Sequence, residues 1–258
     1  MRRLPALIFS CLSATLVFAA CSSSDEEDQE TLASFCSRWA RAACSPEVVS
    51  ACQAADENDC RDSQVTFCLD ALPAAGFSGA RADQCIDAIE AAYEDADITS
   101  DEIFTVLRFA TPCDQLIRGP RSEGEACESR RDCDAPGGFD CVFKGDMTAG
   151  TCQLPETVAA GRDCSSANAV CEPGFYCNGD NCIAGESVGD PCTDHAQCGS
   201  DGYCGLTSLC QARAEVGSPC GFDEQCASGL CYQFSATEQV CTDRLRLSRS
   251  EPICEELR

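Results

Sequence analysis

The sequence predicts a small disulfide-rich protein: an N-terminal all-α domain stapled by cysteines, then four tandem four-cysteine modules with short β-hairpins and little regular structure. The chain has 26 cysteines in 258 residues, and sixteen of them fall into four successive groups of four. Apolar residues recur at helical spacing before Cys113 but are scattered singly from Cys113 to Cys254. A segment that buries so little apolar surface depends on covalent cross-links.

Residues 1–20 have the features of an export signal. Arg2 and Arg3 give the positive start, residues 6–18 are apolar, and two alanines precede Cys21. A cysteine in that place resembles the lipobox of bacterial lipoproteins, in which Cys21 is lipidated and becomes the mature N-terminus. An ordinary secretory signal is the alternative interpretation.

The number of cysteines favours lipidation. Cys11 leaves with the signal and Cys21 carries lipid, so 26 − 2 = 24 cysteines remain, an even number. No other apolar run approaches the roughly 18 residues that a bilayer-spanning helix needs, so the expected anchor is the lipid alone. Residues 21–30 then form a polar, acidic tether.

The charge of the chain excludes some partners. The net charge is −25, and removal of Arg2 and Arg3 takes it to −25 − 2 = −27. Such a surface repels nucleic acid and anionic lipid headgroups. We therefore expect no nucleic acid, contact with the membrane through the N-terminal lipid only, and an unknown protein or cell-envelope ligand as the partner.

Residues 31–116 are predicted to form a helical domain of five helices. The apolar stripes are Leu32, Phe35, Cys36, Trp39, Ala40 and Ala43 in the first helix, Val65, Cys68, Leu69 and Leu72 in the third, and Ala82, Ile86, Ile89 and Tyr93 in the fourth. Ser45-Pro46-Glu47 starts the second helix. Thr99 and Glu102 form a capping box at the start of the fifth.

Seven cysteines lie in this helical half: Cys36, Cys44, Cys52, Cys60, Cys68, Cys85 and Cys113. Eight residues of helix rise about 12 Å, whereas bridged Cα atoms lie within about 7 Å. Cys36 and Cys44 therefore cannot pair within one helix, and bridges must run between helices. Because seven is odd, one bridge must reach Cys254 in the predicted tail, residues 244–258. We predict Cys113 as its partner because it lies outside the helices.

Residues 117–243 are predicted to hold the four modules, at about 124–152, 161–182, 189–210 and 217–241. The predicted disulfide cysteines are Cys127, Cys133, Cys141 and Cys152, then Cys164, Cys171, Cys177 and Cys182, then Cys192, Cys198, Cys204 and Cys210, then Cys220, Cys226, Cys231 and Cys241. The loops between the third and fourth cysteines contain 10, 4, 5 and 9 residues. Variable loops on a constant frame are where binding surfaces usually lie.

The segment from Cys192 to Cys204, with Cys198 in its middle, resembles the cysteine-rich repeats of Dickkopf-type and related EGF-like extracellular modules. The whole layout resembles cysteine-rich lipoproteins of myxobacteria and their relatives. The EGF-like resemblance implies crossed pairing, first cysteine with third and second with fourth. The other two pairings of four cysteines remain open on the sequence. The resemblance to the lipoproteins implies a surface or periplasmic protein that binds other molecules.

Two motifs suggest chemistry. Gly185-Glu186-Ser187-Val188-Gly189 matches the Gly-x-Ser-x-Gly pattern, and His195 is the only histidine. A nucleophile elbow requires an α/β sheet, whereas this match lies where two modules join, so we interpret it as a linker. Residues 95–106 alternate acids as in a calcium loop, but Ser100 and Val106 stand where glycine and glutamate are needed.

The chain contains no Cys-x-x-Cys pair, so no zinc knuckle or redox site is predicted, and we expect neither a metal nor a cofactor. A disulfide framework of this density belongs outside the cytoplasm. The sequence predicts a non-enzymatic binding or surface-interaction protein, exported, anchored by lipid to the outer membrane and facing the periplasm or the cell surface. The alternatives are a serine hydrolase or peptidase using Ser187 and His195, or a protease inhibitor.

Overall fold

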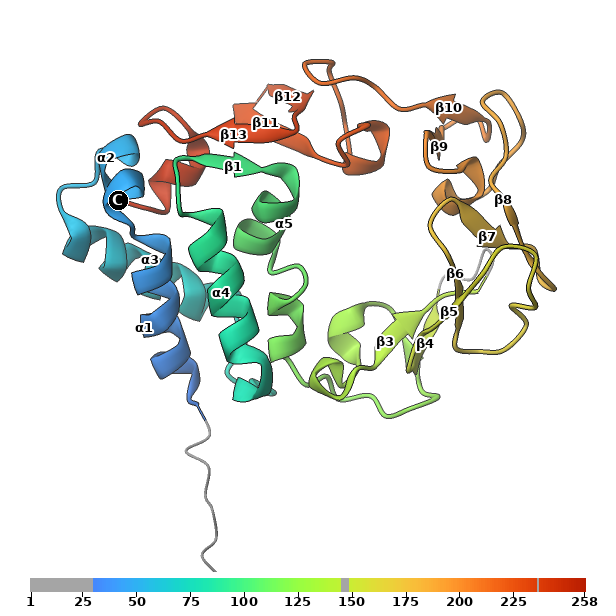
Figure 1. The fold of residues 1–258 in the computed structure, drawn as a ribbon, viewed down its shortest axis with the longest axis horizontal. Helices are drawn as coiled ribbons and strands as arrows, with labels where there is room; N and C mark the ends of the chain where they lie inside the picture. Colours follow the sequence, from blue (N-terminus) through green and yellow to red (C-terminus); the bar gives the residue numbers. More distant parts are fainter. Residues whose placement is uncertain (1–29, 145–148, 236) are drawn as a thin grey trace, which may run out of the picture.

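A computed structural model of the chain describes residues 30–144, 149–235 and 237–258. Helices come first and short hairpins follow, as the sequence predicts. The modules leave the helical domain at one end, and the C-terminal strands return to its other end, so that the chain closes on itself (Figure 1). The predicted signal segment and Cys21 lie outside the described residues. Within the described part of the chain, no helix has the length and apolar character to cross a bilayer.

The five predicted helices are present, and short 3-10 turns accompany them. They are α1 (Leu32–Ala43), α2 (Pro46–Cys52), α3 (Glu57–Ala71), η1 (Gly79–Arg81), α4 (Ala82–Ala92), α5 (Ser100–Arg108) and η2 (Cys113–Leu116). The side chains of Thr31, Ser45 and Asp56 accept backbone N–H groups at the starts of α1, α2 and α3. At α5, the Thr99 N–H and hydroxyl both donate to Glu102 Oε2 at 2.7 Å, which closes the predicted box.

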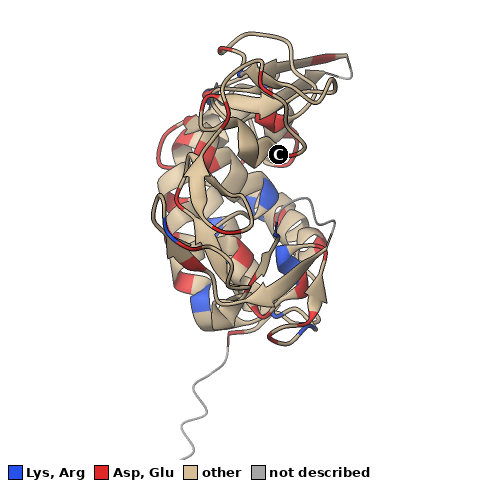
Figure 2. Cartoon of the chain, turned by 90° about the vertical axis from the view of Figure 1, so that its right-hand side faces the viewer, with Lys and Arg blue, Asp and Glu red and all other residues tan. Residues whose placement is uncertain are grey.

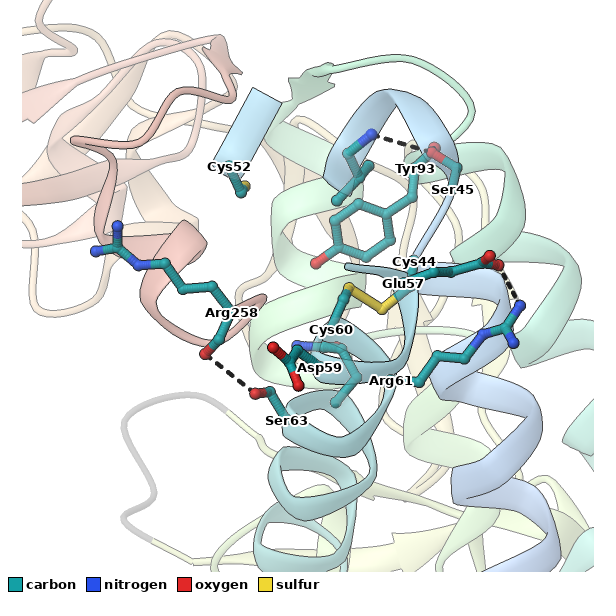
Figure 3. The surroundings of a disulfide bond; sticks show 12 residues. Cys44, Ser45, Cys52, Glu57, Asp59, Cys60, Arg61, Ser63, Tyr93 and Arg258 are labelled. Carbon is teal, nitrogen blue, oxygen red and sulfur yellow. Dashed lines mark hydrogen bonds and ion pairs between the residues drawn. A yellow bond between two sulfur atoms is a disulfide. The ribbon is translucent and has the colours of Figure 1, made fainter. Parts of the chain in front are cut away.

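The predicted buried face of α3 is right at Cys68 and Leu72 but wrong at Leu69. Leu69 is 42% exposed, whereas Cys60, Gln64 and Cys68 form the buried face of this helix. The cause is covalent, because Cys36–Cys68 and Cys44–Cys60 join α1 to α3 and so set the rotation of α3. Figure 3 shows the Cys44–Cys60 bridge at the end of α1.

The predicted partner of Cys254 is also wrong, although its bridge to the helical half is present. Cys254 pairs with Cys52 at the end of α2, and Cys113 pairs with Cys85 of α4. The C-terminal segment forms β13 (Arg244–Arg246), which pairs antiparallel with β1 (Asp97–Thr99), and then η7 (Pro252–Glu255). This return brings Cys254 to α2, while η2 places Cys113 against α4.

The end of the chain is fastened by polar contacts as well. Ser63 Oγ on α3 donates to the Arg258 carbonyl at 3.0 Å, close to the Cys44–Cys60 bridge (Figure 3). Gln64 is buried between two partners: its Oε1 accepts from Trp39 Nε1 at 3.0 Å, and its Nε2 donates to the Glu256 carbonyl at 2.6 Å. The interior of the helical domain therefore recognises the C-terminal segment specifically.

The four modules are built from short hairpins and 3-10 turns. The strands are β2 (Ala126–Cys127), β3 (Asp140–Val142), β4 (Gly150–Gln153), β5 (Glu156–Val158), β6 (Ala169–Cys171), β7 (Phe175–Cys177), β8 (Cys182–Ala184), β9 (Gly202–Cys204), β10 (Cys210–Ala212), β11 (Cys231–Ser235) and β12 (Glu238–Cys241). The turns are η3 (Arg130–Asp132), η4 (Ala135–Gly137), η5 (His195–Cys198) and η6 (Asp223–Gln225).

All four modules have the crossed pairing that the EGF-like resemblance implies. The bridges are Cys127–Cys141 and Cys133–Cys152, Cys164–Cys177 and Cys171–Cys182, Cys192–Cys204 and Cys198–Cys210, and Cys220–Cys231 and Cys226–Cys241. In every module the third and fourth cysteines stand opposite each other on one hairpin. Each hairpin therefore offers two neighbouring sulfurs, and the preceding loop supplies a partner for each.

Module four is unlike the others because it shares the main core. Leu230 and Tyr232 belong to the same buried cluster as Phe35, Trp39 and Ile103 of the helical domain. Residues 244–258, expected as a tail, add Leu245, Leu247, Ile253 and Leu257 to that cluster. The buried clusters of modules one to three consist almost entirely of their own cysteines.

Candidate binding surface

Large apolar side chains are exposed mainly on the modules and their linkers. Of eight such residues in the described part of the chain, seven lie between residues 143 and 216: Phe143, Leu154, Val170, Val188, Leu206, Leu209 and Val216. Leu206, the most exposed, projects fully into solvent. Leu206 and Leu209 occupy the loop between the third and fourth cysteines of module three, where the sequence predicts a binding surface.

The apolar residues of the linkers were missed by sequence reasoning. Val188 and Val216 stand directly before the opening glycines of modules three and four, and Leu154 follows the last cysteine of module one. Their repeated place beside the module boundaries is the signal that could have identified them. Because these side chains are not buried by the fold, they are available to a partner.

A groove of about 440 Å³ lies where modules one, two and three meet. Every residue of β3, β6 and β7 lines it, and Asp194 and Gln197 of module three form part of its wall. Its apolar side chains include Phe143, Val170 and Phe175. Its volume falls within the usual range of ligand sites, about 300–1,000 Å³.

Lys144, the only lysine of the chain, ties module one to module two at this groove. Its Nζ donates to the carbonyl of Cys164 at 3.0 Å and to the carbonyl of Ala169 at 2.7 Å. Burial lowers the pKa of Lys144, and two of its three donors are occupied. Its role in the structure is therefore to brace the groove.

Carboxylates lie at the edge of the groove. Tyr176, which lines it, donates its hydroxyl to Glu186 Oε1 at 2.8 Å. Burial, together with this hydrogen bond, raises the pKa of Tyr176. Among the described residues, neither Glu186 nor Asp194 forms an ion pair. Seen from the side of modules two and three, acidic positions are spread over the molecule and outnumber basic ones (Figure 2).

Ser187 and His195 have separate partners in the structure. The Ser187 N–H donates to Asp190 Oδ2 at 3.1 Å in an exposed turn. His195 is half-buried in η5, and its Nδ1 accepts the Cys204 N–H at 3.1 Å. No hydrogen bond between Ser187 and His195 is found among the described residues.

The imidazole of His195 also takes part in an aromatic cluster that sequence reasoning missed. Its ring centroid lies 5.6 Å from that of Phe222 and 6.3 Å from that of Tyr203. Phe222 belongs to module four, so this cluster links module four to module three. The single histidine thus has a packing role at a module boundary.

Three cysteine sulfurs approach one another within 4.8 Å in each module, which is a spacing that metal sites also use. Every one of these sulfurs is in a disulfide, and a metal binds the thiolate. In the acidic segment near α5, Asp97 pairs with Arg244 at 3.1 Å, and Thr99 and Glu102 form the helix cap described above.

Comparisons with protein-family models, curated proteins and solved structures found no match to this chain.

Proposed function

We propose that this protein is an extracytoplasmic binding protein without catalytic activity, anchored to the outer membrane through lipid on Cys21, whose disulfide-rich modules contact a protein or ligand of the cell envelope. The observation that carries the proposal is the distribution of exposed apolar side chains, seven of eight of which lie on modules and linkers between residues 143 and 216. The twelve disulfides support the extracytoplasmic location.

A rigid frame favours binding by such a surface. Crossed bridges hold the short loops of each module, so little conformational entropy is lost when a partner binds. Exposed apolar groups next to acidic ones give contact area and orientation together.

The binding proposal is tested with the oxidised protein as bait and envelope proteins of the source cell quantified by mass spectrometry. The variants Leu206→Ser and Leu209→Ser remove exposed apolar groups of module three. Leu69→Ser is the matched control, because Leu69 on α3 and Leu209 are exposed to similar extents, 42% and 40%. We expect the module variants to lose specific partners at least fivefold and the control to retain them. Unchanged retention by both module variants would contradict this proposal.

Lipid anchoring is tested separately. Cells grown with an alkyne-labelled fatty acid should incorporate the label into the wild-type chain and not into Cys21→Ser. The wild-type chain should fractionate with the outer membrane, and the variant should be released as soluble protein. A wild-type chain without label would show that residues 1–20 are an ordinary secretory signal.

A further inference from the structure

We propose that the groove between modules one, two and three binds an extended peptide segment of a partner protein, in which apolar residues alternate with Arg or Lys. This inference rests on the proposed binding function and adds the chemistry of the partner. It depends on three features of the groove: the strands that line it, the apolar side chains it exposes and the charge that surrounds it.

The strands favour a peptide over a compact small molecule. β3 is an outer strand of the sheet ordered β2-β4-β3, and β6 and β7 each belong to a two-stranded sheet. All three strands line the groove over their full length, and each therefore has one side without a strand neighbour among the described residues. Some main-chain groups of these strands are already bonded within the protein: the Cys141 N–H donates to Asp140 Oδ1, the Phe175 N–H donates to the Glu172 carbonyl, and the Ala169 carbonyl accepts from Lys144 Nζ. An extended chain would bond to the main-chain groups of these edges that remain.

The exposed apolar side chains of the groove favour apolar residues in the bound peptide. Phe143 is 46% exposed and Val170 is 41% exposed at its rim. Phe175, which also lines the groove, is partly buried against the cysteine cluster of module two. Contact with an apolar side chain of a partner removes this surface from water, which stabilises the complex by roughly 25 cal/mol per Å² buried.

The charge decides which residues flank those apolar ones. The carboxylates of Asp140 and Asp194 line the groove. Beyond the lining, modules two and three are acidic as a whole, since residues 161–210 contain seven acidic residues and one basic residue, Arg162. None of these eight residues forms an ion pair in the described structure. Among the described residues that line the groove, the only cation is Lys144, and its Nζ is directed at backbone carbonyls. A second copy of the chain, with its net charge of −25, is repelled, whereas Arg and Lys are attracted.

The test uses fluorescence anisotropy with the full oxidised protein and three labelled hexapeptides. The probe alternates Arg with Phe and Val; the second peptide replaces each Arg with Glu, and the third replaces Phe and Val with Ser. We expect only the basic, apolar peptide to bind measurably. Its Kd should rise about tenfold in Phe143→Ser and about two- to fivefold in Asp194→Asn, the range expected for one rim charge.

The controls are chosen to separate the groove from the rest of the surface. Leu69→Ser removes an exposed apolar side chain of α3, outside the groove, and Glu238→Gln removes an exposed charge on module four; both should leave the Kd within twofold of wild type. Because Asn also caps a 3-10 or helical turn, Asp194→Asn should keep the fold. Circular dichroism and non-reducing peptide mapping of each variant verify this.

Several results would overturn the inference. Equal binding of the acidic and basic peptides removes the charge argument, and binding that Phe143→Ser leaves unchanged places the peptide elsewhere. Envelope partners that are lost in Leu206→Ser but retained in Phe143→Ser would leave the proposed binding function intact and reject the groove. Loss of no partner in any variant would reject the proposed function itself.

Discussion

Module three and module four have the same order of paired cysteines, yet they bury different material. The buried cluster of module three contains only Cys192, Cys198 and Cys210, with the partly buried Cys204 packed against it. Module four has its own cysteine cluster and in addition places Leu230 and Tyr232 in the core of the helical domain. The same pattern of two crossed disulfides is therefore found with and without contact to an apolar core. In module four the difference is made by Leu230 and Tyr232, the two residues on either side of the third cysteine, Cys231.

The same contrast extends to the whole chain. The buried clusters of modules one to three are made mainly of bridged cysteines, whereas the helical domain, module four and the C-terminal segment share one interior. The predictions below test this division, beginning with the largest expected effect.

Full reduction should separate the two bodies. Each bridge contributes about 2–4 kcal/mol, and modules one to three have almost no apolar core to replace it. Hydrogen exchange followed by mass spectrometry should show complete loss of protection over residues 124–212 in reductant. Peptides of α1, α4 and the segment around Leu230 should keep part of theirs. Persistent protection of modules one to three in protein whose cysteines are all alkylated would show that their bridges are dispensable.

Removal of a single bridge should destabilise either the shared core or one module only, depending on which bridge is removed. Cys52→Ala with Cys254→Ala should lower the free energy of unfolding of the shared core by about 2–4 kcal/mol, because it releases the C-terminal segment. Cys164→Ala with Cys177→Ala should increase exchange only within module two. Thermal unfolding followed by circular dichroism, with exchange mapping, distinguishes the two.

Truncation before Cys254 checks the same bridge chemically. One thiol should become reactive, and peptide mapping after alkylation should place it at Cys52. A label at Cys113 instead would restore the pairing that the sequence led us to expect and contradict the structure.

Substitution of Gln64 tests the polar joint inside the shared core. Gln64→Leu leaves the Trp39 indole N–H and the Glu256 carbonyl without their partner, and a buried unsatisfied group costs about 1–3 kcal/mol. Chemical denaturation should show this loss. Gln84→Leu on the exposed face of α4 is the control and should stay within about 0.5 kcal/mol of wild type. Equal stability of the two variants would mean that Gln64 does not hold the C-terminal segment.

Local signals in the sequence predicted much of the fold. The capping residues Ser45 and Thr99 start helices where the pattern placed them. The crossed pairing agrees with a resemblance of spacing, because the third and fourth cysteines of each module share a hairpin. These features depend on residues that are close in sequence.

Long-range features could not be predicted in the same way. The partner of Cys254 lies 202 residues away, and nothing in the local sequence distinguishes Cys52 from Cys113. The rotation of α3 depends on two bridges to α1, so the apolar pattern of Val65 and Leu69 was misleading. The groove is lined by residues of three modules that are far apart in the sequence. The sequence shows its apolar residues only as single positions and does not show that they lie close together.

The smallest expected effect concerns a turn of module one that is held by a carboxylate. Asp132 Oδ2 accepts the N–H groups of Glu128 and Ser129 at 2.8 and 2.9 Å, and these two hydrogen bonds lower the pKa of Asp132 below its ordinary value of 3.8. A pKa lower in the folded state means a contribution that is present above the unfolded pKa and lost as the pH falls through the folded one. The turn should therefore loosen only below about pH 4.

Nuclear magnetic resonance can follow this loosening through the amide proton shifts of Glu128 and Ser129 between pH 6 and pH 2. Asp132→Asn keeps an acceptor oxygen but does not titrate at this position, so its amide shifts should change less than those of wild type over the same range. The bridges Cys127–Cys141 and Cys133–Cys152 enclose the turn, and among the described residues the buried cluster of module one is separate from that of the helices. The circular dichroism of the helical domain should consequently be the same in both proteins at each pH. A difference between them in helix content at low pH would show that module one is energetically coupled to the shared core, and the division into two bodies would then be wrong.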